Sequence, residues 1–144
     1  MNRLATIGYQ SDTVDGVIAR LKAADVELLV DVRAVAASRR AGFSKTILSN
    51  SLNAAGVDYL HLRALGTPKA GRDAAKAGRA QEMADIFAVH MEEPASQLAL
   101  AEAVELTGKR RIALLCYEDD PACCHRTILA DEIRRRLKCE VVNL

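Results

Sequence analysis

IALLCYEDDPACCHRTILADEIRRRL, residues 112–137, contains an apolar strand, a polar loop and a helix in succession. The run from Ile112 to Leu115 predicts the strand, and Thr127 to Leu137 is typical of a helix. In α/β proteins, a loop that leads from a strand into a helix is a common ligand site, because the first N–H groups of the helix are unpaired and its dipole is positive there. Three of the four cysteines and one of the three histidines fall in this loop, so we expect the functional site here.

The rest of the chain repeats this alternation of strands and helices. Short apolar or alternating runs predict strands, and segments with apolar residues on one face predict helices. We therefore expect a single α/β domain over residues 1–144, with three layers and a mostly parallel, Rossmann-like sheet of about five strands. These patterns do not give the order of the strands. The predicted strands cover residues 4–7, 28–33, 57–62, 111–117 and 140–143, and the predicted helices cover 13–24, 44–55, 81–91, 95–106 and 124–137.

The composition is that of a globular cytoplasmic protein. Hydrophobic residues make up 50% and charged residues 27% of the 144 residues, which is ordinary for one domain. No apolar run is long enough to cross a membrane, and the N-terminus lacks a signal-peptide pattern. We therefore expect a cytoplasmic location, no membrane partner, and cysteines that are reduced thiols or ligands. Aromatic residues make up only 3%, which argues against a nucleic-acid binder that stacks bases on aromatic rings.

The net charge of +1 hides an uneven distribution of charge along the chain. Residues 33–79 are mostly basic, and residues 82–120 are mostly acidic. A basic segment of this kind indicates an anionic partner, either a small molecule or the phosphates of a nucleic acid. The alternative is that these charges lie on solvated helix faces and need no ligand.

Polar side chains follow four of the predicted strands. Because the carboxyl ends of parallel strands lie at the same edge of a sheet, we expect Asp31, Arg33, Cys116 and Arg126 to share one cleft there. The polar residues are Tyr9 after the first strand, Asp31 and Arg33 after the second, His61 and Arg63 after the third, and Cys116 and Glu118 after the fourth.

Several of these residues also have a purely structural interpretation. Asp31 and Arg33 could pair with each other at the end of their strand. Cys116 could be a small buried hydrophobic residue, as cysteine often is, and Cys139 is expected in the core. Cys123 is given no role, because it lies beside Cys124 and should point another way.

Cys124-His125-Arg126 stands at the predicted start of a helix, where the dipole and the free N–H groups favour a thiolate. Arg126 could hold a phosphate or a carboxylate through two parallel hydrogen bonds. A phosphatase loop of the Cys-x5-Arg type does not fit, because Ala122 stands six positions after Cys116. A zinc site of Cys116, Cys124 and His125 is chemically possible. Its spacing matches no strong zinc pattern, however, and adjacent side chains on a helix diverge, so we predict no metal and no cofactor.

Five ordered motifs resemble those of one family. They are Thr6-Ile-Gly-Tyr9, Val30-Asp31-Val-Arg33, Ser38-Arg39-Arg40 with Phe43-Ser44-Lys45, Tyr59-x-His61-Leu62-x-x-Leu65-Gly66, and Cys116-x-Glu118-x5-Cys124-His125-Arg126. Over nearly its whole length the chain is similar to the bacterial and archaeal α/β proteins catalogued as domain of unknown function 488. Family members usually have a proline where this chain has Ala36, which implies a less rigid loop after the second strand. The family has no settled activity, so the resemblance implies a site rather than a reaction. The implied site residues are Tyr9, Asp31, Arg33, Ser38, Arg39, Arg40, Cys116, Glu118, Cys124, His125 and Arg126.

We expect a small enzyme that acts on an anionic, phosphate-bearing substrate. The alternative is a non-catalytic module that binds nucleic acid or another partner through its basic residues. The enzyme is favoured, because a protein that only binds phosphate has no need of two thiols and a carboxylate beside its arginines. The oligomeric state is left open. The expected catalytic residues are Cys116 or Cys124 as nucleophile, Asp31 or Glu118 as general acid or base, and His125, and the expected substrate-binding residues are Tyr9, Arg33, Ser38, Arg39, Arg40 and Arg126.

Residues 69–79 are rich in alanine, glycine, lysine and arginine and have no apolar periodicity. They are expected to form a long mobile loop or lid, or a weak helix. Four cations recur at steps of three or four residues, so in a helix they would align on one face and repel one another. We therefore predict a lid over the loop of residues 116–126 that a bound anion orders, with a plain flexible loop as the alternative.

Overall fold

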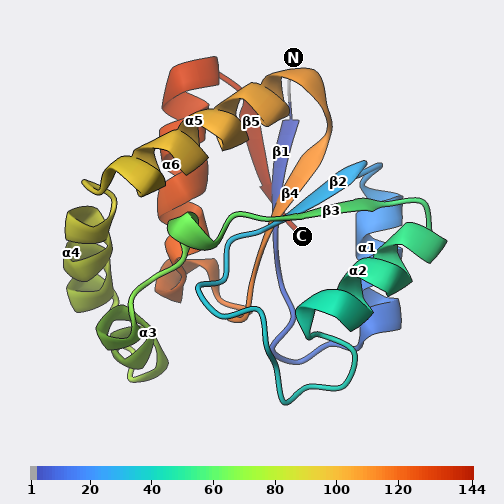
Figure 1. Cartoon of the computed structure of the whole chain (residues 1–144), viewed down its shortest axis with the longest axis horizontal. Coiled ribbons are helices and arrows are strands. Elements are labelled where there is room, and N and C mark those ends of the chain that lie inside the picture. Colours follow the sequence, from blue (N-terminus) through green and yellow to red (C-terminus); the bar gives the residue numbers. More distant parts are fainter. Residues whose placement is uncertain (1–2) are drawn as a thin grey trace.

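The computed structural model describes residues 3–144, which form a five-stranded parallel sheet with helices on both faces (Figure 1). The strands are β1 (Arg3–Gly8), β2 (Leu28–Asp31), β3 (Asp58–His61), β4 (Ile112–Cys116) and β5 (Glu140–Asn143). Their order across the sheet is β3-β2-β4-β1-β5, and every neighbouring pair is parallel. The predicted α/β fold with a parallel sheet of five strands is confirmed.

The strand β4 lies at the centre of the sheet, because it pairs with both β1 and β2. All five of its residues are buried, which is typical of a strand that is covered on both faces. In the usual Rossmann order the first strand lies next to the second. Here β4 separates them, so the loop that follows β4 emerges between the carboxyl ends of β1 and β2.

The helices form one layer on each side of the sheet, as Figure 1 shows. One layer consists of α1 (Val14–Ala23) and α2 (Lys45–Ala54), and its core includes Ala113 and Leu115 of β4. The other consists of α3 (Lys69–Lys76), α4 (Ala80–His90), α5 (Pro94–Lys109) and α6 (His125–Leu137), and its core includes Ile112, Leu114 and Cys116. Two short 3-10 helices, η1 (Arg63–Leu65) and η2 (Pro121–Cys123), complete the fold. None of the helices within residues 3–144 is long and apolar enough to cross a membrane.

Most of the segment 69–79 is helical, in agreement with the weak helix that was one of the expectations for it. The helix α3 packs against α4 through Gly71 and Ala74, both of which are buried. A β-carbon at Gly71 would lie 3.4 Å from the Ile86 side chain of α4 but only 2.2 Å from the Thr67 side chain, so the absence of a side chain at Gly71 makes room for Thr67. Lys69 pairs with Asp73 four residues later, which offsets part of the repulsion among the cations. Whether anions order this segment stays a prediction.

Candidate functional site

The expected site residues lie at the carboxyl edge of the sheet, but they form two clusters on opposite faces. In the pairing of β2 with β4, Asp31 is opposite Leu115, so Asp31 and Cys116 point to different faces. Asp31 and Arg33 belong to the side covered by α1 and α2, whereas Cys116 faces α6. The expectation of one shared cleft is therefore corrected: the sheet itself separates the two groups.

The first cluster is a buried ion pair at the end of β2. The Nε and Nη2 groups of Arg33 donate to the two carboxylate oxygens of Asp31, at 2.9 and 2.7 Å. The Nη1 group donates to the hydroxyl of Tyr9 at 3.0 Å and to the carbonyl of Phe43 at 2.7 Å. Tyr59 donates its hydroxyl to the same carboxylate. The Asp31 carboxylate also accepts the N–H of Arg33 at 3.0 Å, a local turn that ends the strand at Asp31.

These contacts make the first cluster a structural unit. Burial opposes a charge on Arg33, but the hydrogen bonds and the charge of Asp31 outweigh it and raise the pKa of the guanidinium. Burial, together with the Asp31 charge, raises the pKa of Tyr59. His61 donates its Nε2–H to the carbonyl oxygen of Arg33, 2.7 Å away, as a structural histidine does. Asp31 and Arg33 thus pair with each other, which was the structural interpretation left open by the sequence.

The second cluster consists of Cys116, Cys124, His125 and Glu118, which we call the thiol cluster. The Sγ atom of Cys116 lies 3.6 Å from Nδ1 of His125 and 3.4 Å from Oε2 of Glu118. The Sγ atom of Cys124 lies 3.9 Å from the same Nδ1. Both thiols and the imidazole are buried, and Glu118 is half-buried at the edge of the group. The ring of Phe87 from α4 packs edge-on against the imidazole, with centroids 5.2 Å apart.

Cys124 and His125 converge because the helix α6 begins between them. Cys124 is the N-cap and has extended backbone angles, φ −131° and ψ 136°, whereas His125 is the first helical residue. Two adjacent residues in different conformations can point to the same place, which two helical neighbours cannot. The expectation that these side chains diverge was therefore wrong, since it assumed that both belong to the helix.

The orientation of His125 is fixed from the far side of its ring. Its Nε2 lies 2.7 Å from the carbonyl oxygen of Val32, an acceptor, so Nε2 carries the hydrogen and Nδ1 presents a lone pair to the two sulfurs. Burial lowers the pKa of His125, but the hydrogen bond and charge of Cys124 outweigh it, and the net direction is upward. Burial raises the pKa of Cys124 well above its ordinary value. The two sulfurs therefore face the same imidazole nitrogen.

Arg126 supports the loop of the thiol cluster from inside the protein. Arg126 is 1% exposed, and its guanidinium donates to the carbonyl groups of Glu118 and Asp119. Its Nε has no hydrogen-bond partner, and within residues 3–144 it takes part in no ion pair. Thr127 adds a hydrogen bond to the carbonyl of Pro121 at 2.7 Å. The loop from Glu118 to Pro121 is therefore held in place by the first turn of α6.

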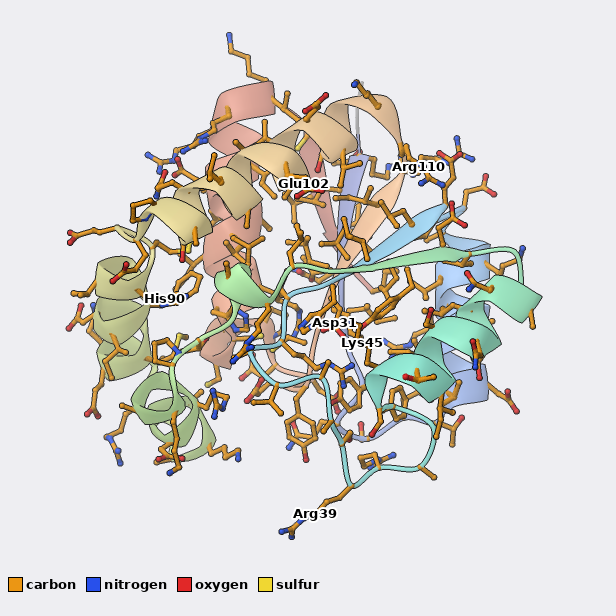
Figure 2. All side chains as sticks on the ribbon, viewed as in Figure 1. Asp31, Arg39, Lys45, His90, Glu102 and Arg110 are labelled. Atoms are coloured by element: carbon orange, nitrogen blue, oxygen red, sulfur yellow. The ribbon has the colours of Figure 1, made fainter. Side chains whose placement is uncertain are left out.

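The remaining expected residues lie in the loop before α2. Ser38 accepts the N–H of Arg40 through its hydroxyl at 3.1 Å, and Arg40 donates to the carbonyl groups of Gln10 and Asp12. Arg39 is exposed and points away from the molecule (Figure 2). Ser38 and Arg40 thus fasten this loop to the segment after β1.

Sequence patterns missed two contributors to the thiol cluster. The carbonyl of Val32 orients His125, and a main-chain group leaves no signal in the residue type. Phe87 falls within the predicted helix 81–91 but was given no role, and its contact with His125 depends on how α4 packs. Tyr59 was part of a quoted motif but was not named as a site residue, although it completes the Asp31 network.

Comparison with known proteins identifies a family and nothing more specific. Neither the curated proteins nor the solved structures give a match to this chain. The family model described as domain of unknown function DUF488 matches residues 13–133, which include both clusters except Tyr9. The chain therefore belongs to the DUF488 family.

Proposed function

We propose that this protein is a small enzyme that acts on an anionic, phosphate-bearing substrate at the thiol cluster. The observation that carries the proposal is the position of the Cys116 sulfur, 3.6 Å from Nδ1 of His125 and 3.4 Å from Glu118. A nucleophile beside a base, with the base held by a third group, is the usual arrangement for covalent catalysis. Here the carbonyl of Val32 is the third group.

In this proposal Cys116 is the nucleophile and His125 its base. The Nδ1 atom of His125 accepts the thiol proton, and the sulfur attacks phosphorus, so that a sulfur–phosphorus bond forms. The phosphorus–oxygen bond to the leaving group breaks, and the proton on His125 passes to the leaving oxygen. Water then displaces the sulfur, Glu118 accepts the proton of the water and returns it to Cys116, and phosphate is released.

Two features favour an anionic substrate. The helix α6 begins at the cluster without a side-chain cap, so its first N–H groups and positive dipole end are directed toward an incoming anion. The buried guanidinium of Arg126 adds a positive charge behind the loop, since it bonds carbonyl groups rather than a carboxylate. Arg33 and Arg40 are engaged by other groups of the protein, and Arg39, in the loop before α2, points away from the molecule, so this proposal assigns the anion to the start of α6 and Arg126.

Phosphate release by the purified chain tests this function. The substrates are p-nitrophenyl phosphate, nucleotides, and RNA or DNA with a terminal phosphate, all assayed with a chelator present. We expect Cys116→Ser to abolish the release, and Glu118→Gln to slow it by roughly 10²–10⁴-fold. The matched control is Cys139→Ser, because Cys139 is also buried but packs in the core outside the cluster.

Alkylation gives a second measurement that needs no substrate. With a chelator present, we expect iodoacetamide to modify Cys116 faster than Cys139, because both thiols are buried but Cys116 has the His125 imidazole beside it. Equal rates for these two thiols, or phosphate release that survives Cys116→Ser, would show that Cys116 is not the nucleophile.

A further inference from the structure

We propose that Cys116, Cys124 and His125 form a binding site for a divalent transition-metal ion, and that Zn²⁺ is the ion it takes. This inference goes beyond the proposed function, which concerns the metal-free thiol. The two sulfurs and the imidazole nitrogen all lie within 4.8 Å of one another, and they come from two separate elements, the end of β4 and the start of α6.

The distances agree with those of a tetrahedral zinc site. Zinc bonds of about 2.3 Å to sulfur and about 2.05 Å to nitrogen, at tetrahedral angles, place the sulfur and nitrogen atoms about 3.6 Å apart. The observed separations are 3.6 Å from Cys116 to Nδ1 and 3.9 Å from Cys124 to Nδ1. These two distances depart from the tetrahedral value by a few tenths of an ångström at most. The two sulfurs lie within 4.8 Å of each other, and a bound ion would hold them about 3.8 Å apart.

The imidazole is already oriented as a ligand. Histidines that bind metals almost always donate their other ring N–H to a carboxylate, a carbonyl or a water, which fixes the tautomer and the ring plane. His125 does this toward the carbonyl of Val32 at 2.7 Å, so its lone pair points at the two thiols.

Charge and donor type select the ion. As ligands, two thiolates and a neutral imidazole carry a charge of −2 in total, which a divalent ion neutralises. The resulting complex has no net charge, so its burial in apolar surroundings costs less than the burial of a charged group. Those surroundings include Phe87, which packs on the imidazole. Sulfur and imidazole donors favour Zn²⁺ and its neighbours in the transition series, whereas Mg²⁺ and Ca²⁺ require oxygen donors.

The loop of residues 118–121 is held by hydrogen bonds without a bound ion. Arg126 fixes the main chain at Glu118 and Asp119, and Thr127 fixes it at Pro121. The group supplies three donors, so a fourth coordination position would remain for water or a substrate atom, with the Glu118 carboxylate beside Cys116. Three protein ligands with an open fourth position are typical of catalytic rather than structural zinc.

Metal binding and the nucleophilic role of Cys116 exclude each other. A bound ion occupies the lone pair of Nδ1 and both sulfurs, so His125 can no longer act as a base and Cys116 can no longer attack. We therefore expect Zn²⁺ to protect Cys116 from iodoacetamide and to suppress thiol-dependent phosphate release, and a chelator to reverse both effects.

Titration of the full chain with Co²⁺ and Zn²⁺ tests the site directly and needs no substrate. We expect one equivalent of Co²⁺ to give a thiolate-to-cobalt charge-transfer band and a tetrahedral visible spectrum, and Zn²⁺ to displace it and raise the melting temperature. Absence of the band and of any thermal shift by Zn²⁺ in the unmodified chain would overturn the proposal. This titration does not test phosphate release, which has its own assay, so metal binding and the proposed function can each fail without the other.

Variants assign the ligands. Cys116→Ser, Cys124→Ser and His125→Asn should each weaken Zn²⁺ binding by more than about 100-fold, beyond the roughly 10–100-fold typical of a group that only supports a ligand. Cys123→Ser is the matched control, because Cys123 is adjacent to Cys124 but lies outside the three-donor group, and it should bind Zn²⁺ as the parent does. Circular dichroism of each variant verifies its fold, and an unchanged affinity in all three folded variants would contradict the assignment.

Discussion

Replacing Asp31 with asparagine is expected to disturb both clusters through the end of β2. The side chains of Asp31 and Arg33 are fixed on one face of the sheet, and the carbonyl of Val32 between them holds His125 on the other. The Asp31–Arg33 ion pair therefore fixes the main chain at Val32, and the Val32 carbonyl in turn fixes the orientation of the imidazole. Asp31 is in this sense a positioning residue for the thiol cluster.

The size of the effect follows from burial. The side chain of Asp31 is 0% exposed and that of Arg33 is 5% exposed, and their closest atoms are 2.7 Å apart. Removing one charge of such a pair leaves the other buried without a partner, which costs about 3–5 kcal/mol. For a chain of this length about 2–4 °C of melting temperature is lost per kcal/mol, so Asp31→Asn should lower the melting temperature by roughly 6–20 °C.

An exposed ion pair in the same protein gives the matched control. Asp58 pairs with Arg110 at the same distance, 2.7 Å, but its side chain is 63% exposed. Solvent screens such a pair, so Asp58→Asn should cost no more than about 1 kcal/mol. The double replacement Asp31→Leu with Arg33→Met removes both buried charges, and it should recover much of the stability that Asp31→Asn loses.

Urea unfolding followed by circular dichroism measures the free energies, and Co²⁺ titration measures the site. We expect Asp31→Asn to weaken Co²⁺ binding by roughly 10–100-fold, the usual effect of losing the support of a metal-bound histidine. The reasoning is refuted if Asp31→Asn destabilises the protein no more than Asp58→Asn, or if Co²⁺ binding is the same as in the parent chain.

Two further predictions concern pH and the segment 69–79. The raised pKa of Tyr59 keeps its hydroxyl protonated in the folded state above about pH 10, where an unfolded tyrosine ionises. The free energy of unfolding should therefore fall as the pH rises beyond about 10, and it should fall less in Tyr59→Phe. Urea unfolding at pH 9 and pH 11 measures this change, and an equal change in the two proteins would contradict the prediction. Hydrogen exchange at α3 should slow when nucleotides or oligonucleotides are added, if anions order this segment. Unchanged exchange with every anion would make α3 a plain connecting helix.

The strands and helices could be predicted because their signals are local. The apolar run of β4 and the spacing of apolar residues on the helix faces can be recognised within a short window of sequence, and these residues are the buried ones. The strand order could not be predicted in the same way, because it depends on pairing between segments that are far apart. The insertion of β4 between β1 and β2 leaves no trace in any one of the three sequences.

The gathering of polar residues at one edge was also predictable, but their division between two faces was not. A spacing of two residues shows that Asp31 shares a face with Arg33, and that Cys116 shares a face with Glu118. It does not relate one strand to the next, because a shift of one residue in register reverses every side chain. The register that places Asp31 opposite Leu115, one residue before Cys116, is what separates the ion pair from the thiols.

The chemistry of the thiol cluster depends on the residue at which α6 begins, His125 rather than Cys124. If α6 began at Cys124, that residue would have helical angles, and its sulfur would turn away from His125 as adjacent helical side chains do. Because Cys124 is instead an extended N-cap, its sulfur and that of Cys116 face the same nitrogen. Helix ends cannot be read from sequence to within one residue. A Cys-His pair at the predicted start of a helix should therefore be considered as a pair of metal ligands even where its spacing matches no known zinc pattern.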